Sequence, residues 1–178
     1  MLFETIFSGF GGQGVLSMGK LLAYSAMKEG KEVSWMPSYG PEMRGGTANC
    51  MVNISDEPIS SPVVNEYDVV VVLNLPSLKK FESHVKKGGL LLWESSTIKF
   101  PPTRTDIQIV ALPAVDKANT ELKNVKVMNM IILGALVKLK HLVKPESLII
   151  ALKETLPVRH HNLIPLNQQA IELGMSLV

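Results

Sequence analysis

The sequence predicts a single α/β domain over residues 1–178, with a mostly parallel or mixed sheet and a helical C-terminal third. Three observations support this prediction. An apolar run at residues 2–7 leads into a glycine-dense turn and then into a helical pattern. Residues 67–74 form a β-branched run without polar alternation, which is typical of a parallel strand covered on both faces. The last third repeats apolar residues at helical spacing and contains no internal repeat or low-complexity linker.

The first half of the chain predicts a strand at 2–7, a helix at 15–29 capped by Gly30, and a second strand at 31–36. This strand–helix–strand order favours parallel pairing of the first two strands. Two prolines and three glycines predict an irregular loop at 37–46. Alternation predicts a half-exposed strand at 47–54, followed by a turn and a brief partner strand at 59–64.

The second half continues with the central strand at 67–74 and a helix that starts at Pro76 and extends to about Val85. Residues 87–89 are expected to separate it from a buried strand at 90–94, and a further strand follows at 106–112. One long helix is predicted from Asn119 or Thr120 to Leu142, buried between 127 and 137. A helix from 145 stops before Pro157, and the last helix covers 163–173 with Gly174 as its cap.

The composition excludes several functional classes. A net charge of +2 with no run of Lys and Arg argues against binding to nucleic acid or to an anionic membrane. The single cysteine, Cys50, excludes a disulfide framework and an iron–sulfur cluster held by this chain alone. No segment reaches the ~20 apolar residues of a membrane span, and the first residues form a predicted strand rather than a charged leader. We therefore expect a soluble, cytoplasmic protein.

The glycine turn is the first candidate site. Gly9, Gly11 and Gly14 satisfy the G-x-G-x-x-G spacing between a strand and a helix, as in dinucleotide-binding folds. The acidic residue that should close the next strand and bind a ribose hydroxyl is missing, because residues 33–36 are Val, Ser, Trp and Met. Dinucleotide binding is therefore disfavoured, and the simpler alternative is that the glycines serve only the turn.

The loop at 39–46 is the second candidate. It carries the Tyr39 phenol, the Glu42 carboxylate and the Arg44 guanidinium on a backbone stiffened by proline. Arg44 could bind a carboxylate or phosphate at two points, or pair with Glu42 or Asp56 on the surface. His160 and His161 are adjacent and lack a further ligand at helical spacing, so solvated histidines are favoured over a metal site.

The two candidate segments together resemble a known family. Residues 9–15 (GFGGQGV), followed by residues 38–46 (SYGPEMRGG), are similar to the gamma subunit of 2-oxoacid:ferredoxin oxidoreductases. The likeness continues through the strand at 68–73 and Asn129-Met130, and reaches Gly174. It therefore covers nearly the whole chain, and neither main motif departs from the family pattern.

The resemblance implies a subunit of an enzyme that converts a 2-oxoacid, coenzyme A and oxidised ferredoxin to acyl-CoA, CO₂ and reduced ferredoxin. Thiamine diphosphate, Mg²⁺ and iron–sulfur clusters are expected on other subunits of the complex, with no cofactor firmly bound by this chain. Partners are then alpha, beta and delta-type subunits, with ferredoxin reached through the complex. The chain is not expected to be active alone, and the isolated chain is expected to self-associate.

We assign seven residues to contacts with coenzyme A or with other subunits: Gly11, Gly12, Gln13, Gly14, Ser38, Tyr39 and Arg44. We assign no catalytic and no metal-binding residue to this chain. We expect the turn and the loop to lie together beyond the carboxyl ends of the parallel strands. Two alternatives remain open at this point: a stand-alone nucleotide-binding protein with a Rossmann-like turn, and a scaffold whose loops only bind other subunits.

Overall fold

The computed structural model describes residues 1–40 and 46–178. Its framework is a six-stranded sheet in the order β2-β3-β1-β4-β5-β6. The strands are β1 (Leu2–Phe10), β2 (Glu32–Tyr39), β3 (Thr47–Ser55), β4 (Tyr67–Val72), β5 (Val85–Glu94) and β6 (Gln108–Leu112). β1, β4, β5 and β6 pair in parallel, whereas β3 runs antiparallel to both β1 and β2. The prediction of a mixed α/β sheet is confirmed.

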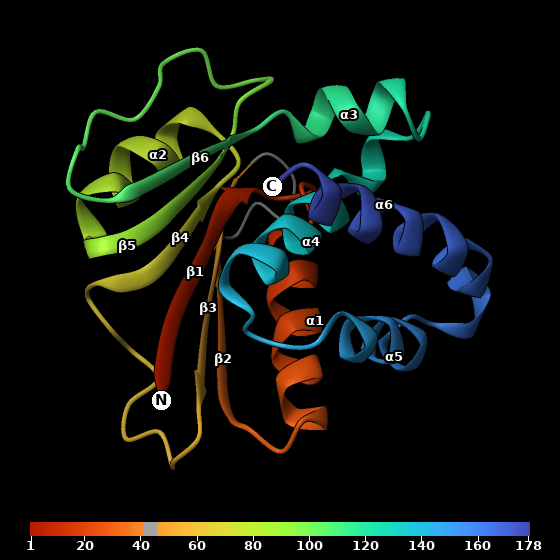
Figure 1. The fold of residues 1–178 in the computed structure, drawn as a ribbon, viewed down its shortest axis with the longest axis horizontal. Coiled ribbons are helices and arrows are strands. Elements are labelled where there is room, and N and C mark those ends of the chain that lie inside the picture. The colour runs from red at the N-terminus through yellow and green to blue at the C-terminus, as the bar shows by residue number, and fades with distance from the viewer. Residues whose placement is uncertain (41–45) are drawn as a thin grey trace.

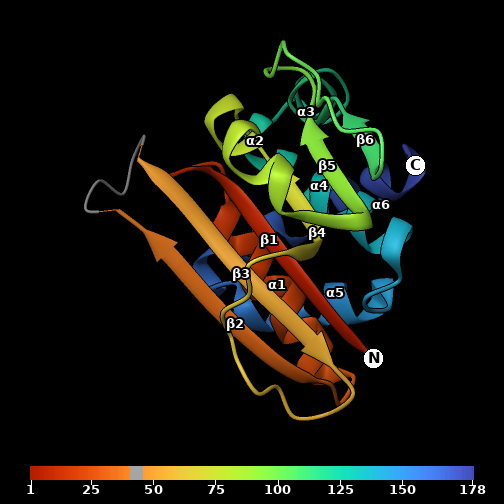
Figure 2. The same ribbon diagram turned by 90° about the vertical axis from the view of Figure 1, so that its left-hand side faces the viewer.

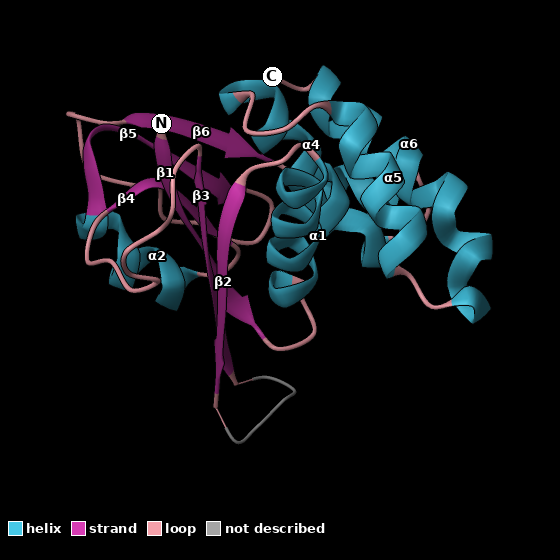
Figure 3. Ribbon diagram, turned by 90° about the horizontal axis from the view of Figure 1, so that it is seen from below, coloured by secondary structure: helices cyan, strands magenta, loops and turns pink. Residues whose placement is uncertain are grey.

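Helices cover the two faces of this sheet unequally (Figure 1). One face carries α1 (Val15–Lys28) and α4 (Met128–Lys140), with α3 (Ala114–Thr120), α5 (Pro145–Thr155) and α6 (Ile164–Ser176) packed around them. The other face carries α2 (Leu75–Phe81), which continues into the short 3₁₀ helix η1 (Glu82–His84). Figure 3 shows the larger helical layer on one side of the strands and α2 on the other.

Two hydrophobic clusters result from this layering. The larger cluster lies between the sheet on one side and α1 and α4 on the other. It includes Val71, Leu22 and Ile131, all of which are fully buried. The smaller lies beneath α2 and includes Val70 and Phe81. Adjacent residues of β4 therefore enter opposite clusters, which confirms β4 as a central strand covered on both faces. No helix of the described ranges is long and apolar enough to cross a membrane.

The predicted pairing of the first two strands is wrong. β3 lies between β1 and β2, with Phe7 opposite Cys50 on one side and Pro37 opposite Cys50 on the other. β2 thereby becomes an edge strand, and it extends through Pro37, Ser38 and Tyr39, which were predicted to be loop. An edge position tolerates a proline because one side of its backbone needs no partner within the sheet. Figure 2 shows β2, β3 and β1 side by side with α1 behind them.

Three further predictions of element limits are wrong. Residues 59–64 form no strand, and residues 87–89 lie inside β5 rather than before it. The long helix predicted from residue 119 is instead α3, the 3₁₀ helix η2 (Val125–Val127) and α4. Lys123 adopts a positive φ of 53°, and the Asn124 side chain accepts a hydrogen bond from the N–H of Lys126. This turn interrupts an otherwise continuous helical pattern.

Gly174 does not cap the last helix, because α6 continues to Ser176. A Cβ atom on Gly174 would lie 1.8 Å from the carbonyl oxygen of Ile131, and one on Gly134 would lie 2.1 Å from that of Ile171. The two glycines thus allow the backbones of α4 and α6 to touch. Their role is close helix packing, which fixes the C-terminal helix against the core.

Candidate functional site

The glycine turn connects β1 to α1 at the carboxyl end of the sheet. Gly12 and Gly14 have φ values of 96° and 81°, which side chains other than glycine rarely adopt. Gly14 is the N-cap residue of α1, and no side chain caps that end. The first turn of α1 also has no acidic residue, so its free N–H groups and the positive end of the helix dipole are directed at the turn.

A backbone hydrogen bond brings the two motif segments together. The N–H of Gly11 donates to the carbonyl oxygen of Gly46 at 2.8 Å. Tyr39, at the end of β2, pairs in register with Ala48 of β3, and Phe10 of β1 pairs with Thr47. The ends of β1 and β2, the start of β3 and the glycine turn therefore meet at one point. The expected closeness of the turn and the loop is seen for Tyr39 and Gly46, whereas residues 41–45 lie outside the described residues.

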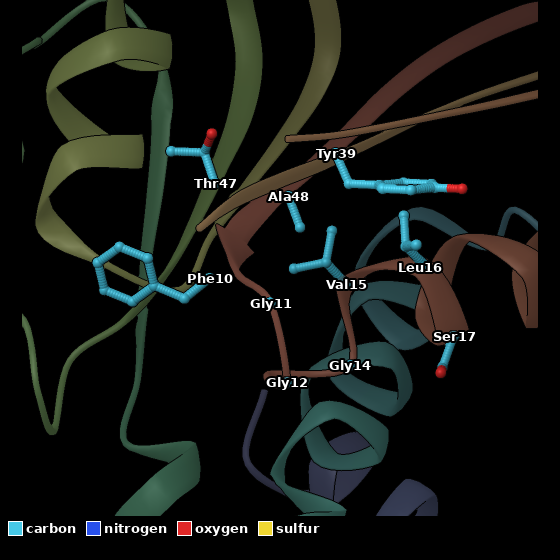
Figure 4. A pocket seen from close by; sticks show the side chains of 10 residues that line it. All are labelled: Phe10, Gly11, Gly12, Gly14, Val15, Leu16, Ser17, Tyr39, Thr47 and Ala48. Atoms are coloured by element: carbon cyan, nitrogen blue, oxygen red, sulfur yellow. The ribbon is translucent and has the colours of Figure 1, made fainter. Parts of the chain in front are cut away.

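A cavity of about 290 Å³, the glycine pocket, occupies this point (Figure 4). Its lining includes the turn, the start of α1 and the strand ends, namely Phe10, Gly11, Gly12, Gly14, Val15, Leu16, Ser17, Tyr39, Thr47 and Ala48. The Tyr39 ring lies above Leu16, and its hydroxyl points away from the turn. None of these residues has an ionisable side chain other than the Tyr39 phenol. The lining contributed by the described residues thus consists of apolar walls and backbone N–H groups.

Gln13 does not line the pocket and instead fills the crevice between β1 and β4. Its Oε1 accepts a hydrogen bond from the N–H of Phe10 at 2.7 Å, and its Nε2 donates to the carbonyl oxygen of Leu73 at 3.2 Å. A Cβ atom on Gly9 would lie 2.7 Å from Gln13 Oε1, so Gly9 makes room for this amide. The helices after β1 and β4 lie on opposite faces, and dinucleotides bind in such a crevice in doubly wound folds. Here a side chain of the protein occupies it.

Gly14 is in contact with Asn129, the second residue of α4. A Cβ atom on Gly14 would lie 2.3 Å from Asn129 Nδ2. Asn129 is 8% exposed, and its Oδ1 accepts a hydrogen bond from the N–H of Met130 at 3.0 Å. The asparagine therefore supports the glycine turn from behind. The contact leaves no room for a side chain at position 14.

Apart from Gln13, the predicted site residues separate into three groups. Gly11, Gly12, Gly14 and Tyr39 line the glycine pocket. Ser38 is exposed and lies on the opposite face of β2 from Tyr39, because successive strand residues point to opposite faces. Arg44, with Glu42, lies outside the described residues, as does most of the predicted loop at 39–46.

Other pocket residues were not predicted from the sequence. Leu16, Thr47 and Ala48 line the cavity, and only the antiparallel placement of β3 brings the last two there. The lone asparagine in the apolar pattern of 127–137 was a usable signal for Asn129.

The remaining candidates do not form a metal or redox site. Within residues 1–40 and 46–178, no three His, Cys, Asp or Glu residues gather closely enough to hold a metal ion. His160 and His161 are exposed. Cys50 is fully buried, and burial raises the pKa of its thiol to about 12. The thiol is therefore protonated at neutral pH and is a poor metal ligand.

Comparison with known proteins gives a match to one family. The family model of pyruvate ferredoxin/flavodoxin oxidoreductase matches residues 4–177. Ketoisovalerate oxidoreductase subunit VorA of Methanothermobacter thermautotrophicus is 44% identical over 132 residues, which make up 74% of this chain and 27% of that protein. The chain spans only about a quarter of the length of VorA proteins.

Solved structures match over the whole chain. The gamma subunit of a keto/oxoacid ferredoxin oxidoreductase from Geobacter sulfurreducens superposes with a TM-score of 0.83 at 30% identity, covering 98% of this chain and 96% of that one. A 2-oxoglutarate:ferredoxin oxidoreductase from Magnetococcus marinus, with 2-oxoglutarate, coenzyme A and succinyl-CoA bound, has a TM-score of 0.89 at 23% identity. It covers 99% of this chain and 31% of that one, and it supports the fold alone. The chain belongs to the pyruvate ferredoxin/flavodoxin oxidoreductase family.

Proposed function

We propose that this chain is the gamma-type subunit of a 2-oxoacid:ferredoxin oxidoreductase. The complex would decarboxylate a 2-oxoacid oxidatively, transfer the acyl group to coenzyme A and pass the electrons to ferredoxin. The family match over residues 4–177 carries this proposal, and the near-complete mutual coverage with the Geobacter gamma subunit supports it. The names of the relatives include different 2-oxoacids, ketoisovalerate and 2-oxoglutarate. Our proposal assigns the choice of substrate to other subunits.

The proposed role of the chain is to contact coenzyme A and neighbouring subunits, not to carry the redox centres. Its only cysteine is buried with a protonated thiol, so the chain does not fit an iron–sulfur cluster. Thiamine diphosphate, Mg²⁺ and the clusters would be held by alpha, beta and delta-type subunits. We place the complex in the cytoplasm, with ferredoxin as its electron acceptor.

The glycine pocket fits a slender ligand with amide groups, such as the thiol arm of coenzyme A. Its walls at Leu16, Val15 and Ala48 are apolar, and the glycines allow a ligand to approach the backbone. The uncapped N–H groups at the start of α1 can donate to ligand carbonyl oxygens. With the thiol arm bound in this pocket, the chain would orient the arm and exclude water around it. The Magnetococcus enzyme, in which about a third of one chain shares this fold, was solved with coenzyme A bound.

The test is reconstitution of the complex with Tyr39→Ala and, separately, Arg44→Ala. Each complex would be assayed with coenzyme A and with pyruvate, 2-oxoglutarate and 2-oxoisovalerate in turn. We expect assembly by gel filtration and a raised KM for coenzyme A, with the KM for the 2-oxoacid unchanged. Unchanged assembly together with an unchanged KM for coenzyme A in both variants would contradict the proposed contact.

The alternatives predict different results. A scaffold subunit predicts weaker assembly in these variants but the same KM for coenzyme A once the complex has formed. A stand-alone dinucleotide-binding protein predicts that the isolated chain binds NAD or FAD in an equilibrium titration. The Gln13 side chain occupies the crevice that such a ligand would need, so we expect no binding.

A further inference from the structure

The outer edge of β2 is open. β2 is the last strand of the six-stranded sheet, and none of the described strands pairs with its outer side (Figure 2). Backbone groups that point outward from such an edge have no partner within the sheet. The pairing of β2 with β3 shows which groups these are.

One hydrogen bond sets the alternation along β2. The N–H of Gly40 donates to the carbonyl oxygen of Thr47, so these two residues form a hydrogen-bonded pair of the antiparallel ladder. In such a ladder, hydrogen-bonded pairs alternate with pairs whose N–H and C=O groups point away from each other. The continuous register of β2 with β3 then assigns the inward groups to Ser34, Met36 and Ser38.

The alternate residues direct their backbone groups outward, namely Val33, Trp35, Pro37 and Tyr39. Each offers a carbonyl acceptor, and all of them except Pro37 offer an N–H donor. The proline thus occupies a position where its missing N–H costs the sheet nothing, which agrees with this assignment. The edge presents a regular row of donors and acceptors that only an extended backbone can match.

The side chains of β2 do little to protect this edge. Trp35 and Tyr39 are 42% and 57% exposed, and residues 33–40 contain no charged residue. Edges that remain unpaired are usually protected by charged side chains, bulges or a covering segment. Pro37 removes one donor, but the other outward groups remain. The edge is therefore suited to pair with another strand.

We propose that an extended segment of a neighbouring subunit pairs with the outer edge of β2 and adds a strand to the sheet. This inference rests on the proposed function, which gives the chain its neighbouring subunits. In strand addition, main-chain hydrogen bonds supply the affinity and flanking side chains supply the specificity. Beside Trp35 and Tyr39, the added segment would carry apolar or aromatic side chains.

A second copy of the chain fits this edge less well. Two copies of β2 paired along their whole length would each place Pro37 in the new ladder, so the missing donor would occur twice. A segment of a different subunit meets the proline only once. Pairing between two copies is therefore expected when the other subunits are absent, as in the isolated chain.

Amide hydrogen exchange, resolved to single residues, tests the added strand. The chain, diluted until light scattering shows a monomer, is compared with the reconstituted complex. On assembly, exchange at Val33 and Trp35 should slow at least about tenfold, because their N–H groups become hydrogen-bonded. Ser34 and Met36 bond to β3 in both states and are the internal control. Unchanged exchange at Val33 and Trp35 in the assembled complex would overturn the proposal.

A pair of charge variants tests the same edge by affinity. Trp35→Lys places a charge beside the open edge and should weaken binding of the chain to the other subunits about tenfold. Ile109→Lys is the matched control, because Ile109 is 37% exposed on β6, at the opposite edge of the sheet. Circular dichroism should show a wild-type fold for both variants. Equal weakening by both would show a general effect of charge and would contradict the assignment to β2.

Photo-crosslinking identifies the segment that covers the edge. Replacing Glu32, at the exposed start of β2, with p-benzoylphenylalanine should give a crosslink to a peptide of another subunit. A crosslink to a second copy of this chain in the assembled complex would be evidence against the proposal.

Turnover of a 2-oxoacid with coenzyme A and ferredoxin by the wild-type complex judges the proposed function separately. An active complex whose edge amides stay unprotected would refute the added strand and leave the proposed function standing. A chain that enters no active complex would contradict the proposed function, and the added strand with it.

Discussion

The N–H of Gly11 donates a 2.8 Å hydrogen bond to the carbonyl oxygen of Gly46, and this bond joins the two segments that define the site. Gly11 and Gly46 are 35 residues apart in sequence, and each segment contains glycines. The bond fixes the glycine turn against the ends of β2 and β3. Tyr39, Leu16 and Ala48 thereby become walls of one cavity.

The glycine turn should tolerate substitution unequally. Gly12 and Gly14 both have positive φ, but a Cβ atom on Gly12 meets nothing within 4 Å, whereas one on Gly14 would overlap Asn129. Gly12→Ala should therefore lower the free energy of unfolding by about 1–2 kcal/mol, from backbone strain alone. Gly14→Ala should cost about 1–3 kcal/mol more, from the added overlap. Urea unfolding followed by circular dichroism measures both.

The double variant Gly14→Ala/Asn129→Ala is the control for this overlap. Removing the asparagine amide should recover part of the Gly14→Ala loss, because the strain of the positive φ remains and the contact does not. Equal losses in Gly12→Ala and Gly14→Ala would show that Asn129 does not restrict the turn.

A buried carboxylate at the end of β5 should make stability depend on pH. Glu94 is 1% exposed and accepts hydrogen bonds from the N–H groups of Ser96, Thr97 and Val115 and from the Thr97 hydroxyl. Burial alone raises the pKa of Glu94, but these hydrogen bonds outweigh it, so its pKa in the folded protein is lowered. The carboxylate thus contributes stability that is present above the pKa of the unfolded state, about 4.3, and is lost as the pH falls below it.

Glu94→Gln should therefore lower the free energy of unfolding by about 2 kcal/mol at pH 7. The difference between wild type and variant should shrink as the pH falls below about 4. Glu57→Gln, at an exposed position, is the matched control and should change stability little at either pH. A Glu94→Gln difference that stays constant from pH 7 to pH 3 would refute the assigned role of the charge.

The isolated chain should self-associate through the edge of the sheet. β2 is an edge strand, and Trp35 and Tyr39 on it are 42% and 57% exposed. Residues 33–40 contain no charged side chain to discourage pairing with another strand. We expect a dimer or larger species by light scattering, and Trp35→Lys should shift it toward monomer. A monomer at all concentrations for the wild-type chain would be inconsistent with this account.

The sequence predicted the elements better than their arrangement. The β-branched run of β4 and the glycine turn identified the central strand and the start of α1 from local pattern alone. The insertion of β3 between β1 and β2 was not predictable in this way, because strand order depends on contacts between distant segments. The break before α4 was also missed, since Lys123 adopts a positive φ without a glycine or proline to indicate it.

Only part of the candidate site was predicted, again because contacts between distant segments cannot be read from local sequence. The glycines and Tyr39 stood out by residue type and spacing, whereas Leu16, Thr47 and Ala48 are ordinary residues that only the fold brings together. Gln13 was assigned to the ligand or the interface, but its amide is used within the chain to join β1 to β4. Local sequence shows which backbone is unusual, and tertiary contacts decide which side chains face the cavity.

The most direct test of the coenzyme A contact is the KM for coenzyme A in a complex reconstituted with Leu16→Trp. Leu16 is half-buried on the first turn of α1 and lies in the pocket wall beside Tyr39, so the larger side chain should fill the cavity without entering the core. We predict that the complex assembles and that its KM for coenzyme A rises at least about tenfold, the effect of losing about 1.4 kcal/mol of binding. The KM for the 2-oxoacid should not change. An assembled complex with a wild-type KM for coenzyme A would contradict the account.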